Sequence, residues 1–180
     1  MLNKLLQWDI LISEKLRLSE DQKVLRSIAA FLAHSGDSWY IELVLIVGWL
    51  LSRGTLRTFF AYLAGSVVIQ ALFVIAVKFL IKRQRPEGAW GDVYRKTDPH
   101  SFPSGHAARM VMLSVLAFGF GFLVLGWVIV FWGIAVSFAR VAMGVHYLID
   151  IFVGWIIGLL LAVAMLFFRP FFFNLLPFIF

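Results

Sequence analysis

The chain has 180 residues, of which 62% are hydrophobic and 14% are charged, and this composition excludes a water-soluble globular domain and predicts a protein embedded in a bilayer. Its net charge of +6 comes from cations that flank apolar stretches, which favours lipid headgroups or phosphate as partners over nucleic acid. The absence of cysteine excludes a thiolate metal site and a cysteine phosphoenzyme.

Residues 1–36 alternate apolar and charged positions, so no apolar run among them is long enough to cross a membrane. We predict that they form two amphipathic helices on the membrane surface. The first 20 residues also lack the uninterrupted apolar core of a cleavable signal peptide.

Residues 37–169 are predicted to form a transmembrane domain. Residues 38–51 are apolar but short for a crossing, whereas residues 56–81 are long enough for one. Residues 147–168 form the last apolar stretch and carry Asp150 as their only charge.

The uncharged stretch 110–139 is too long for one straight span, because a helix of that length would reach about 45 Å. We predict a hairpin that turns near residues 119–121. Gly154 and Gly158 supply a face of small residues for close helix packing. Residues 170–180 are predicted to form an aromatic tail at the membrane interface. The expected fold is all-α, a polytopic membrane helix bundle with about five or six transmembrane helices.

Residues 82–102 are rich in Gly, Pro and charge and are expected to form a loop outside the hydrocarbon. Asp92, Asp98 and His100 in this loop are expected to be solvated, and we assign them no role. Three other groups of ionisable residues adjoin apolar stretches. They are functional candidates, because desolvating a charge is costly unless a partner compensates for it.

Lys78 and Arg85 form the first group. Positions seven apart lie on one face of a continuing helix, and Pro86 forces the residue before it out of the helical conformation, so the helix should end there. The two cations would then converge at the mouth of the helix. The alternative is a pair of interfacial cations that extend toward the headgroups.

Pro103, Ser104, Gly105 and His106 form the second group, directly before an apolar stretch. A capping serine, a glycine without a Cβ and the positive end of a helix dipole together offer backbone N–H groups to an anion such as phosphate. His106 is placed to give a proton to a leaving group. The alternative is a turn and helix cap with an interfacial histidine.

Arg140, His146 and Asp150 form the third group. His146 and Asp150 are four residues apart, so on a helix the carboxylate can accept a proton from one imidazole nitrogen and leave the other free as a nucleophile. Arg140 offers a planar bidentate donor that suits phosphate oxygens. The alternative is a structural His–Asp pair at the start of a helix.

The predicted hairpin would bring all three groups to one membrane face. An odd number of crossings between His106 and Arg140 would instead separate them by about 30 Å. A single site that contains every group therefore requires the hairpin.

The combined pattern K-x6-RP, PSGH and R-x5-H-x3-D resembles the signature of the type 2 phosphatidic acid phosphatase superfamily, which includes bacterial lipid phosphatases, polyisoprenyl diphosphate phosphatases and vanadium haloperoxidases. The resemblance covers residues 38–168. It implies that His146 attacks phosphorus, that Asp150 orients it, and that His106 protonates the leaving group. It also implies that no metal or other cofactor takes part. The residues it assigns to the phosphoryl oxygens are Lys78, Arg85, Ser104, Gly105 and Arg140.

One position departs from the family pattern, because Ala139 stands where a serine usually precedes the arginine of the third motif. Arg109 is a further candidate for the site. It lies three residues after His106 on the same helical face and could contact phosphate. The alternative is an interfacial arginine that extends to the headgroups.

We expect a metal-independent lipid phosphatase that acts on a phosphate monoester or diphosphate through a phosphohistidine. Polyisoprenyl diphosphate, phosphatidylglycerophosphate and phosphatidic acid are the candidate substrates. A phosphotransferase with the same intermediate would pass the phosphate to an acceptor hydroxyl. A nonenzymatic lipid-phosphate binder is the third alternative, although anion binding has no use for an oriented His–Asp pair. Apart from the substrate, membrane lipids are the expected partners, and no obligate protein partner is evident.

The protein is expected to lie in the plasma membrane with its site at one face. If the N-terminal segment lies on the site face, its cations place that face in the cytoplasm by the positive-inside rule. The resemblance points the other way, because many bacterial relatives face outward. We follow the resemblance and expect an extracytoplasmic site.

Overall fold

The computed structural model describes residues 2–88, 90, 96, 98–177 and 179, so Asp92 lies outside the described residues. These residues form seven α-helices and no strand. The helices are α1 (Leu2–Lys15), α2 (Lys23–Ser35), α3 (Ser38–Leu51), α4 (Gly54–Ile81), α6 (Gly105–Gly119), α7 (Leu123–Ala142) and α8 (Leu148–Leu175). The prediction of an all-α helix bundle is confirmed.

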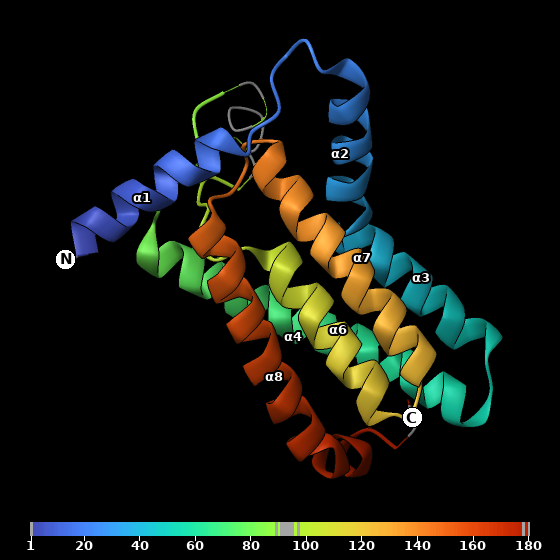
Figure 1. Cartoon of the computed structure of the whole chain (residues 1–180). Helices are drawn as coiled ribbons and strands as arrows, with labels where there is room; N and C mark the ends of the chain where they lie inside the picture. Colours follow the sequence, from blue (N-terminus) through green and yellow to red (C-terminus); the bar gives the residue numbers. More distant parts are fainter. Residues whose placement is uncertain (1, 89, 91–95, 97, 178, 180) are drawn as a thin grey trace.

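Five of these helices are apolar and run side by side as a bundle (Figure 1). By length and composition, α4, α7 and α8 can each cross a membrane, and α3 and α6 are shorter apolar helices of 14 and 15 residues. At 1.5 Å per residue, the two shorter helices are about 21 and 22 Å long, which is less than the hydrocarbon thickness of about 30 Å. The bundle is therefore an integral membrane structure in which α3 and α6 end short of at least one face.

The α6–α7 hairpin is confirmed. Helix α6 ends at Gly119 and α7 begins at Leu123. Gly121 makes the reversal possible, because its φ of +85° lies in the region that side chains disfavour. The Phe122 N–H closes the turn with a hydrogen bond of 2.9 Å to the Ala117 carbonyl. The beginning of α6 and the end of α7 consequently lie at the same end of the bundle, which we call the site end.

Helix α6 lies at the centre of the bundle and crosses α8 at very close range. A Cβ built on Gly158 would lie 2.2 Å from the Ala108 carbonyl oxygen, so only glycine allows the two backbones this approach. At the site end, the Ser104 N–H donates to the Asp150 carbonyl over 2.9 Å and ties the beginnings of α6 and α8 together. The predicted small-residue face of α8 is thus used for helix packing.

Helices α1 and α2 both lie at the site end (Figure 1). Helix α1 runs across the beginning of α8, and α2 packs against α7, where its Ala29 and Ala33 join a buried apolar cluster. The opposite end of the bundle holds the C-terminal part of the chain, because Arg169 donates to the Gly119 carbonyl over 3.3 Å. Helix α8 continues through Pro170 to Leu175, so the aromatic segment predicted from residue 170 begins as helix.

Candidate active site

A cavity of about 300 Å³ opens at the site end and contains residues from all three predicted groups. Helix α4 contributes Lys78, α6 contributes Gly105 and His106, and the turn before α8 contributes His146. Arg109 also lines the cavity, one helical turn beyond His106. The chain therefore brings together residues that lie up to 68 positions apart, from Lys78 to His146, as the hairpin requires.

Lys78 and Arg85 are both buried and are joined by a carboxylate that the sequence did not single out. Asp98 Oδ2 accepts hydrogen bonds from Lys78 Nζ and, over 2.7 Å, from Arg85 Nη2. The Asp98 carbonyl accepts a second bond of 2.7 Å from Arg85 Nε. The expectation that Asp98 is merely solvated is wrong, because its carboxylate contacts Lys78 and Arg85, the two cations that are candidate phosphate ligands.

The path from Lys78 to Arg85 also differs from the prediction of one continuous helix. Helix α4 ends at Ile81, and Lys82 adopts a left-handed conformation with φ of 54°. The chain then leaves the helix axis, so Pro86 does not determine where the helix ends. Arg85 returns to the site through Asp98 and through a 2.8 Å hydrogen bond from its Nη1 to the Val145 carbonyl.

The four-residue spacing of His146 and Asp150 predicted that both lie on one helix. His146 instead lies in the turn before α8. Tyr147 is the N-cap residue, and Asp150 accepts the Tyr147 N–H over 2.9 Å. His146 Nδ1 lies 3.5 Å from Asp150 Oδ2, a distance that places the carboxylate beside the ring but is too long for a strong hydrogen bond. The Asp150 carboxylate therefore makes its stronger interaction with the backbone at the start of α8, and its contact with the imidazole of His146 is the weaker one.

The neighbours of His146 determine which of its nitrogens carries the proton. Arg85 Nη1 lies 3.3 Å from His146 Nε2. Because a guanidinium only donates, Nε2 must be the unprotonated acceptor, and the proton lies on Nδ1, toward Asp150. Burial, together with the positive charges of Arg85, Arg140 and Lys78, holds the pKa of His146 well below its ordinary value of 6.5. At neutral pH the side chain thus presents an unprotonated Nε2, whose lone pair faces Arg85 and must leave that contact to attack phosphorus.

The carboxylate of Asp150 is held from behind by Arg83, a residue that the sequence analysis missed. Arg83 Nη1 donates to Asp150 Oδ1 over 2.7 Å, and Arg83 Nη2 donates to Asp9 of α1 over 2.6 Å. Helix α1 also caps α8, because Asp9 accepts the Ile149 N–H and Ser13 accepts the Leu148 N–H, each over 3.0 Å. Part of the predicted surface segment therefore supports the site directly.

His106 is the second residue of α6, and Ser104 is the N-cap residue of this helix, as predicted. The Ser104 hydroxyl accepts the Ala107 N–H at 3.5 Å, a long contact that leaves the serine free to bond elsewhere. His106 Nε2 lies 2.7 Å from Asp37 Oδ1 in the turn between α2 and α3. Asp37 is a further residue that the sequence analysis missed.

Arg140 and Ala139 occupy the last turn of α7. Arg140 is only 1% exposed, and its charge acts on both histidines. Ala139 packs in the apolar cluster that includes Ala29 and Ala33 of α2. The methyl group that replaces the usual serine hydroxyl therefore faces an apolar neighbour in this chain.

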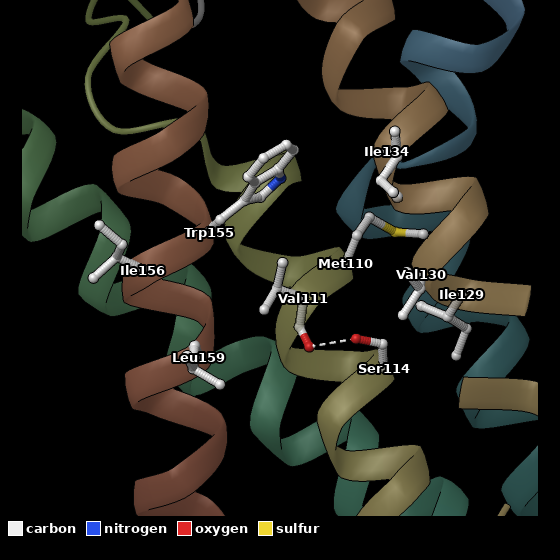
Figure 2. Close-up of a pocket in the computed structure, with 10 residues that line it drawn as sticks. Met110, Val111, Ser114, Ile129, Val130, Ile134, Trp155, Ile156 and Leu159 are labelled. Atoms are coloured by element: carbon white, nitrogen blue, oxygen red, sulfur yellow. Dashed lines mark hydrogen bonds between the residues drawn. The ribbon is translucent and has the colours of Figure 1, made fainter. Parts of the chain in front are cut away.

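A second, apolar pocket of about 350 Å³ lies between α6, α7 and α8 (Figure 2). Figure 2 shows Met110 and Val111 of α6 facing Ile134 of α7 and Trp155 of α8. This pocket and the charged cavity share no lining residue, because Met110, Val111 and Ser114 face α7 and α8, whereas Gly105, His106 and Arg109 line the cavity beside α4. The lining of the apolar pocket suits hydrocarbon and offers no charged group.

The chain matches a family model described as the PAP2 superfamily over residues 55–173. It is 29% identical over 156 residues to undecaprenyl-diphosphatase BcrC of Bacillus subtilis (strain 168), and the match covers 84% of this chain and 78% of the relative. It is 25% identical over 162 residues to the bacitracin transport permease protein BcrC of Bacillus licheniformis, which covers 85% of this chain and 76% of that protein.

Two solved structures share the fold. One is a transmembrane PAP2-type phosphatidylglycerolphosphate phosphatase from Bacillus subtilis, with a TM-score of 0.75 and 22% identity over 93% of this chain and 87% of that one. The other is LpxE of Aquifex aeolicus, with a TM-score of 0.67 and 21% identity over 89% of this chain and 93% of that one. At this level of identity the likeness establishes the fold alone.

Proposed function

Since this chain belongs to the PAP2 superfamily and is a membrane lipid phosphatase, we propose that it hydrolyses a polyisoprenyl diphosphate through a phosphohistidine on His146. The observation that carries the proposal is the state of His146 Nε2. It is an unprotonated nitrogen that accepts from Arg85 at 3.3 Å, in a residue that lines a cavity of about 300 Å³ together with Lys78 and His106. That combination supplies a nucleophile, cations for the phosphoryl oxygens and a proton donor.

In the first step, the lone pair of His146 Nε2 attacks the terminal phosphorus. A P–N bond forms, the P–O bond to the leaving group breaks, and the leaving oxygen takes a proton from His106. Lys78, Arg85 and Arg140 would hold the equatorial oxygens, with the Ser104 hydroxyl and the backbone at Gly105 as further donors. Asp150 would stabilise the positive charge that develops on the imidazole.

In the second step, a water molecule attacks the phosphorus of the phosphohistidine. The water gives a proton to His106, the P–N bond breaks, and inorganic phosphate leaves. His106 thereby regains the proton that it gave up in the first step. The same cations would stabilise both transition states, since the charge on the phosphoryl group is similar in each.

Two observations favour a diphosphate of an isoprenoid as the substrate. The undecaprenyl-diphosphatase from Bacillus subtilis is a relative at 29% identity. In addition, Lys78, Arg85, Arg109 and Arg140 lie at the candidate site, where the facing carboxylates are Asp37, Asp98 and Asp150. This excess of positive charge suits a headgroup with two phosphates better than one with a single phosphate.

We further propose that the protein lies in the plasma membrane with the site facing outward. The N-terminal helices carry cations at the site end, which by the positive-inside rule favours the cytoplasm. Several cations of the site end are engaged within the protein, however. Arg83 is paired with Asp9 and Asp150, and Arg17 donates to the Glu87 carbonyl. A cysteine-accessibility assay at the two ends of the bundle tests the orientation, and labelling of the site end only from the cytoplasm would reverse it.

Phosphate release by the pure protein in detergent tests the reaction. We expect turnover of polyisoprenyl diphosphate to exceed that of phosphatidylglycerophosphate and phosphatidic acid, to persist in excess EDTA, and to disappear in His146→Ala. His100→Ala is the matched control, because His100 meets Phe79 edge-on and is not one of the residues that line the cavity. Retention of activity in His146→Ala would overturn the nucleophile.

Rapid quenching with a substrate labelled at its terminal phosphate tests the intermediate. We expect a labelled protein whose phosphate is stable in alkali and released in acid, as a phosphohistidine is. The label should be absent in His146→Ala and should accumulate in His106→Ala if that variant slows hydrolysis. Product that forms only when an acceptor alcohol is added, with little free phosphate, would identify a phosphotransferase instead.

A further inference from the structure

Asp37 lies in the turn between α2 and α3, outside the residues that the family model matches. It is the N-cap residue of α3, where an aspartate normally accepts a backbone N–H of the first helical turn. Its side chain makes no such bond. Instead, Oδ1 lies 2.7 Å from His106 Nε2, and Oδ2 lies 3.0 Å from His34 Nδ1. Asp37 makes no capping bond to α3 and binds a side chain distant in the sequence, which indicates that it acts on His106.

The turn that carries Asp37 is fixed to the helix that carries His106. Arg109 Nη1 donates to the Gly36 carbonyl and Arg109 Nη2 donates to the Ser38 hydroxyl, each over 2.5 Å. Arg109 and His106 are three residues apart on one face of α6. The face that carries His106 therefore also binds Gly36 and Ser38, the residues on either side of Asp37. The carboxylate and the imidazole are therefore kept in register by two charge-assisted bonds from α6.

We propose that Asp37 is a positioning residue that holds the imidazole of His106 for proton transfer to and from the leaving group. This proposal rests on the proposed function, in which His106 is the proton donor. Because a carboxylate only accepts, the bond to Asp37 places a proton on Nε2 of His106. In the imidazolium form Nδ1 carries the second proton, which goes to the leaving oxygen as the P–O bond breaks. The ring, then neutral with its proton on Nε2, takes a proton at Nδ1 from the attacking water. Asp37 stays ionised throughout.

The charges around His106 explain why it needs such a partner. Arg109 of α6 and Arg140 of α7 both repel a positive charge on the imidazole. Asp37 is the carboxylate in hydrogen-bond contact with the ring, and it offsets this repulsion in the protonated state. Hydrogen bonds from His106 and His34 outweigh the effect of burial and lower the pKa of Asp37 to about 2, so its charge persists at any working pH. The site thus contains two His–Asp pairs, one for the nucleophile and one for the proton donor.

The test compares two small substrates that differ in their need for a proton, phenyl phosphate and 4-nitrophenyl phosphate. We expect Asp37→Asn to reduce kcat/KM for phenyl phosphate by about 10- to 100-fold, since general acid catalysis contributes on this order or more, and kcat/KM excludes the hydrolysis step that both substrates share. The loss for 4-nitrophenyl phosphate should be several-fold smaller, because nitrophenolate leaves without protonation. Glu20→Gln is the control, since it also removes a carboxylate of the N-terminal segment, one that is exposed.

A purely structural role for Asp37 predicts a different result. Loss of fold would reduce both activities by the same factor and lower the melting temperature in detergent. Equal loss for the two substrates in Asp37→Asn therefore overturns the proposal. Asp37→Glu, which restores a carboxylate, should recover part of the activity toward phenyl phosphate.

A double variant separates this proposal from the proposed function. We expect Asp37→Asn to cause no further loss in the background of His106→Ala, because both changes remove one proton transfer. If the parent releases no phosphate from any lipid, or if His106→Ala is fully active, the proposed function fails. If His106→Ala shows the leaving-group dependence and Asp37→Asn does not, only the role of Asp37 fails.

Discussion

Arg83 donates a hydrogen bond of 2.7 Å from Nη1 to Oδ1 of Asp150, the carboxylate that faces His146. The other end of the same guanidinium binds Asp9, which belongs to the first helix of the chain. Asp9 and Asp150 are both buried, so one cation compensates two carboxylates from opposite ends of the sequence. The orientation of the candidate nucleophile therefore depends on residues that belong to none of the three motifs.

Replacement of Arg83 by methionine should impair both stability and turnover. It leaves two buried carboxylates without their shared cation, and breaking a buried ion pair costs on the order of 3 kcal/mol of stability. We expect kcat for the lipid substrate to fall at least ten-fold, because Asp150 is then free to turn away from His146. Arg53→Met, at the opposite end of the bundle, is the matched control. An unchanged kcat in a folded Arg83→Met protein would show that Arg83 does not position Asp150.

Asp98→Asn should tighten substrate binding. The Asp98 carboxylate contacts Lys78 and Arg85, the cations that would bind phosphate, so substrate must compete with it for them. We expect KM to decrease by about 2- to 10-fold, on the scale of one charge-assisted hydrogen bond to a partly exposed group. Initial rates over a range of lipid concentrations in mixed micelles measure this. A higher KM would mean that Asp98 holds the two cations in place for the substrate and does not compete with it.

The decrease of kcat/KM at acidic pH, the acid limb of the pH profile, should shift to a different pH when Arg85 is replaced. Because the pKa of His146 is held well below 6.5, its imidazole stays neutral as the pH falls through 6.5, and kcat/KM should decline only at lower pH. Burial is the largest cause of this lowering, followed by the charges of Arg85, Arg140 and Lys78. Arg85→Gln removes a cation, so the pKa of His146 rises and the acid limb moves to higher pH by about one unit.

Arg85→Gln also weakens phosphate binding, so the position of the limb is informative and the absolute rate is not. Lys82→Gln removes a cation from an exposed position near the same segment and should leave the limb where it is. A limb that does not move in Arg85→Gln would indicate that the group titrating there is not His146.

Gly158→Ala tests whether the crossing of α6 and α8 supports the site. The added Cβ would approach the Ala108 carbonyl oxygen to 2.2 Å, so the helices must move apart. We expect a loss of about 1–3 kcal/mol in stability, as overpacking of a core typically causes. Thermal unfolding in detergent measures this, with Gly65→Ala as the control, because a Cβ at Gly65 meets no atom within 4 Å. Equal melting temperatures for the two variants would contradict this account.

Most of the bundle could be predicted from the sequence because the bilayer imposes strong limits on length and polarity. The stretch 110–139 could be divided correctly because thirty uncharged residues exceed one span, and Gly121 marks the reversal. The apolar span 56–81 ends where α4 ends, but the expected continuation of this helix to Arg85, which relied on Pro86, is wrong. The left-handed conformation of Lys82 ends the helix earlier, and a lysine gives no local signal for that conformation.

Three residues that line the cavity could be predicted because each belongs to a short motif of ionisable residues beside an apolar stretch. Lys78, His106 and His146 are found together in one cavity. Their partners Asp37 and Asp98 could not be predicted in the same way. Each lies in a polar segment where charged residues are usually solvated, and each reaches its partner only through tertiary packing. A local signal existed for Asp37, which precedes a helix as an N-cap residue, but that signal points to capping and not to a histidine.

The reversal at Gly121 also limits which lipids the protein can reach. Because an even number of passes separates His106 from Arg140, every charged group of the site lies at one end of the bundle, and a substrate headgroup can meet them from one leaflet only. A diphosphate headgroup does not cross hydrocarbon unaided, since the cost of moving its charges into the bilayer is prohibitive. The proposed reaction is therefore confined to the lipid pool of a single leaflet, and lipids in the other leaflet become substrates only after a separate protein has flipped them.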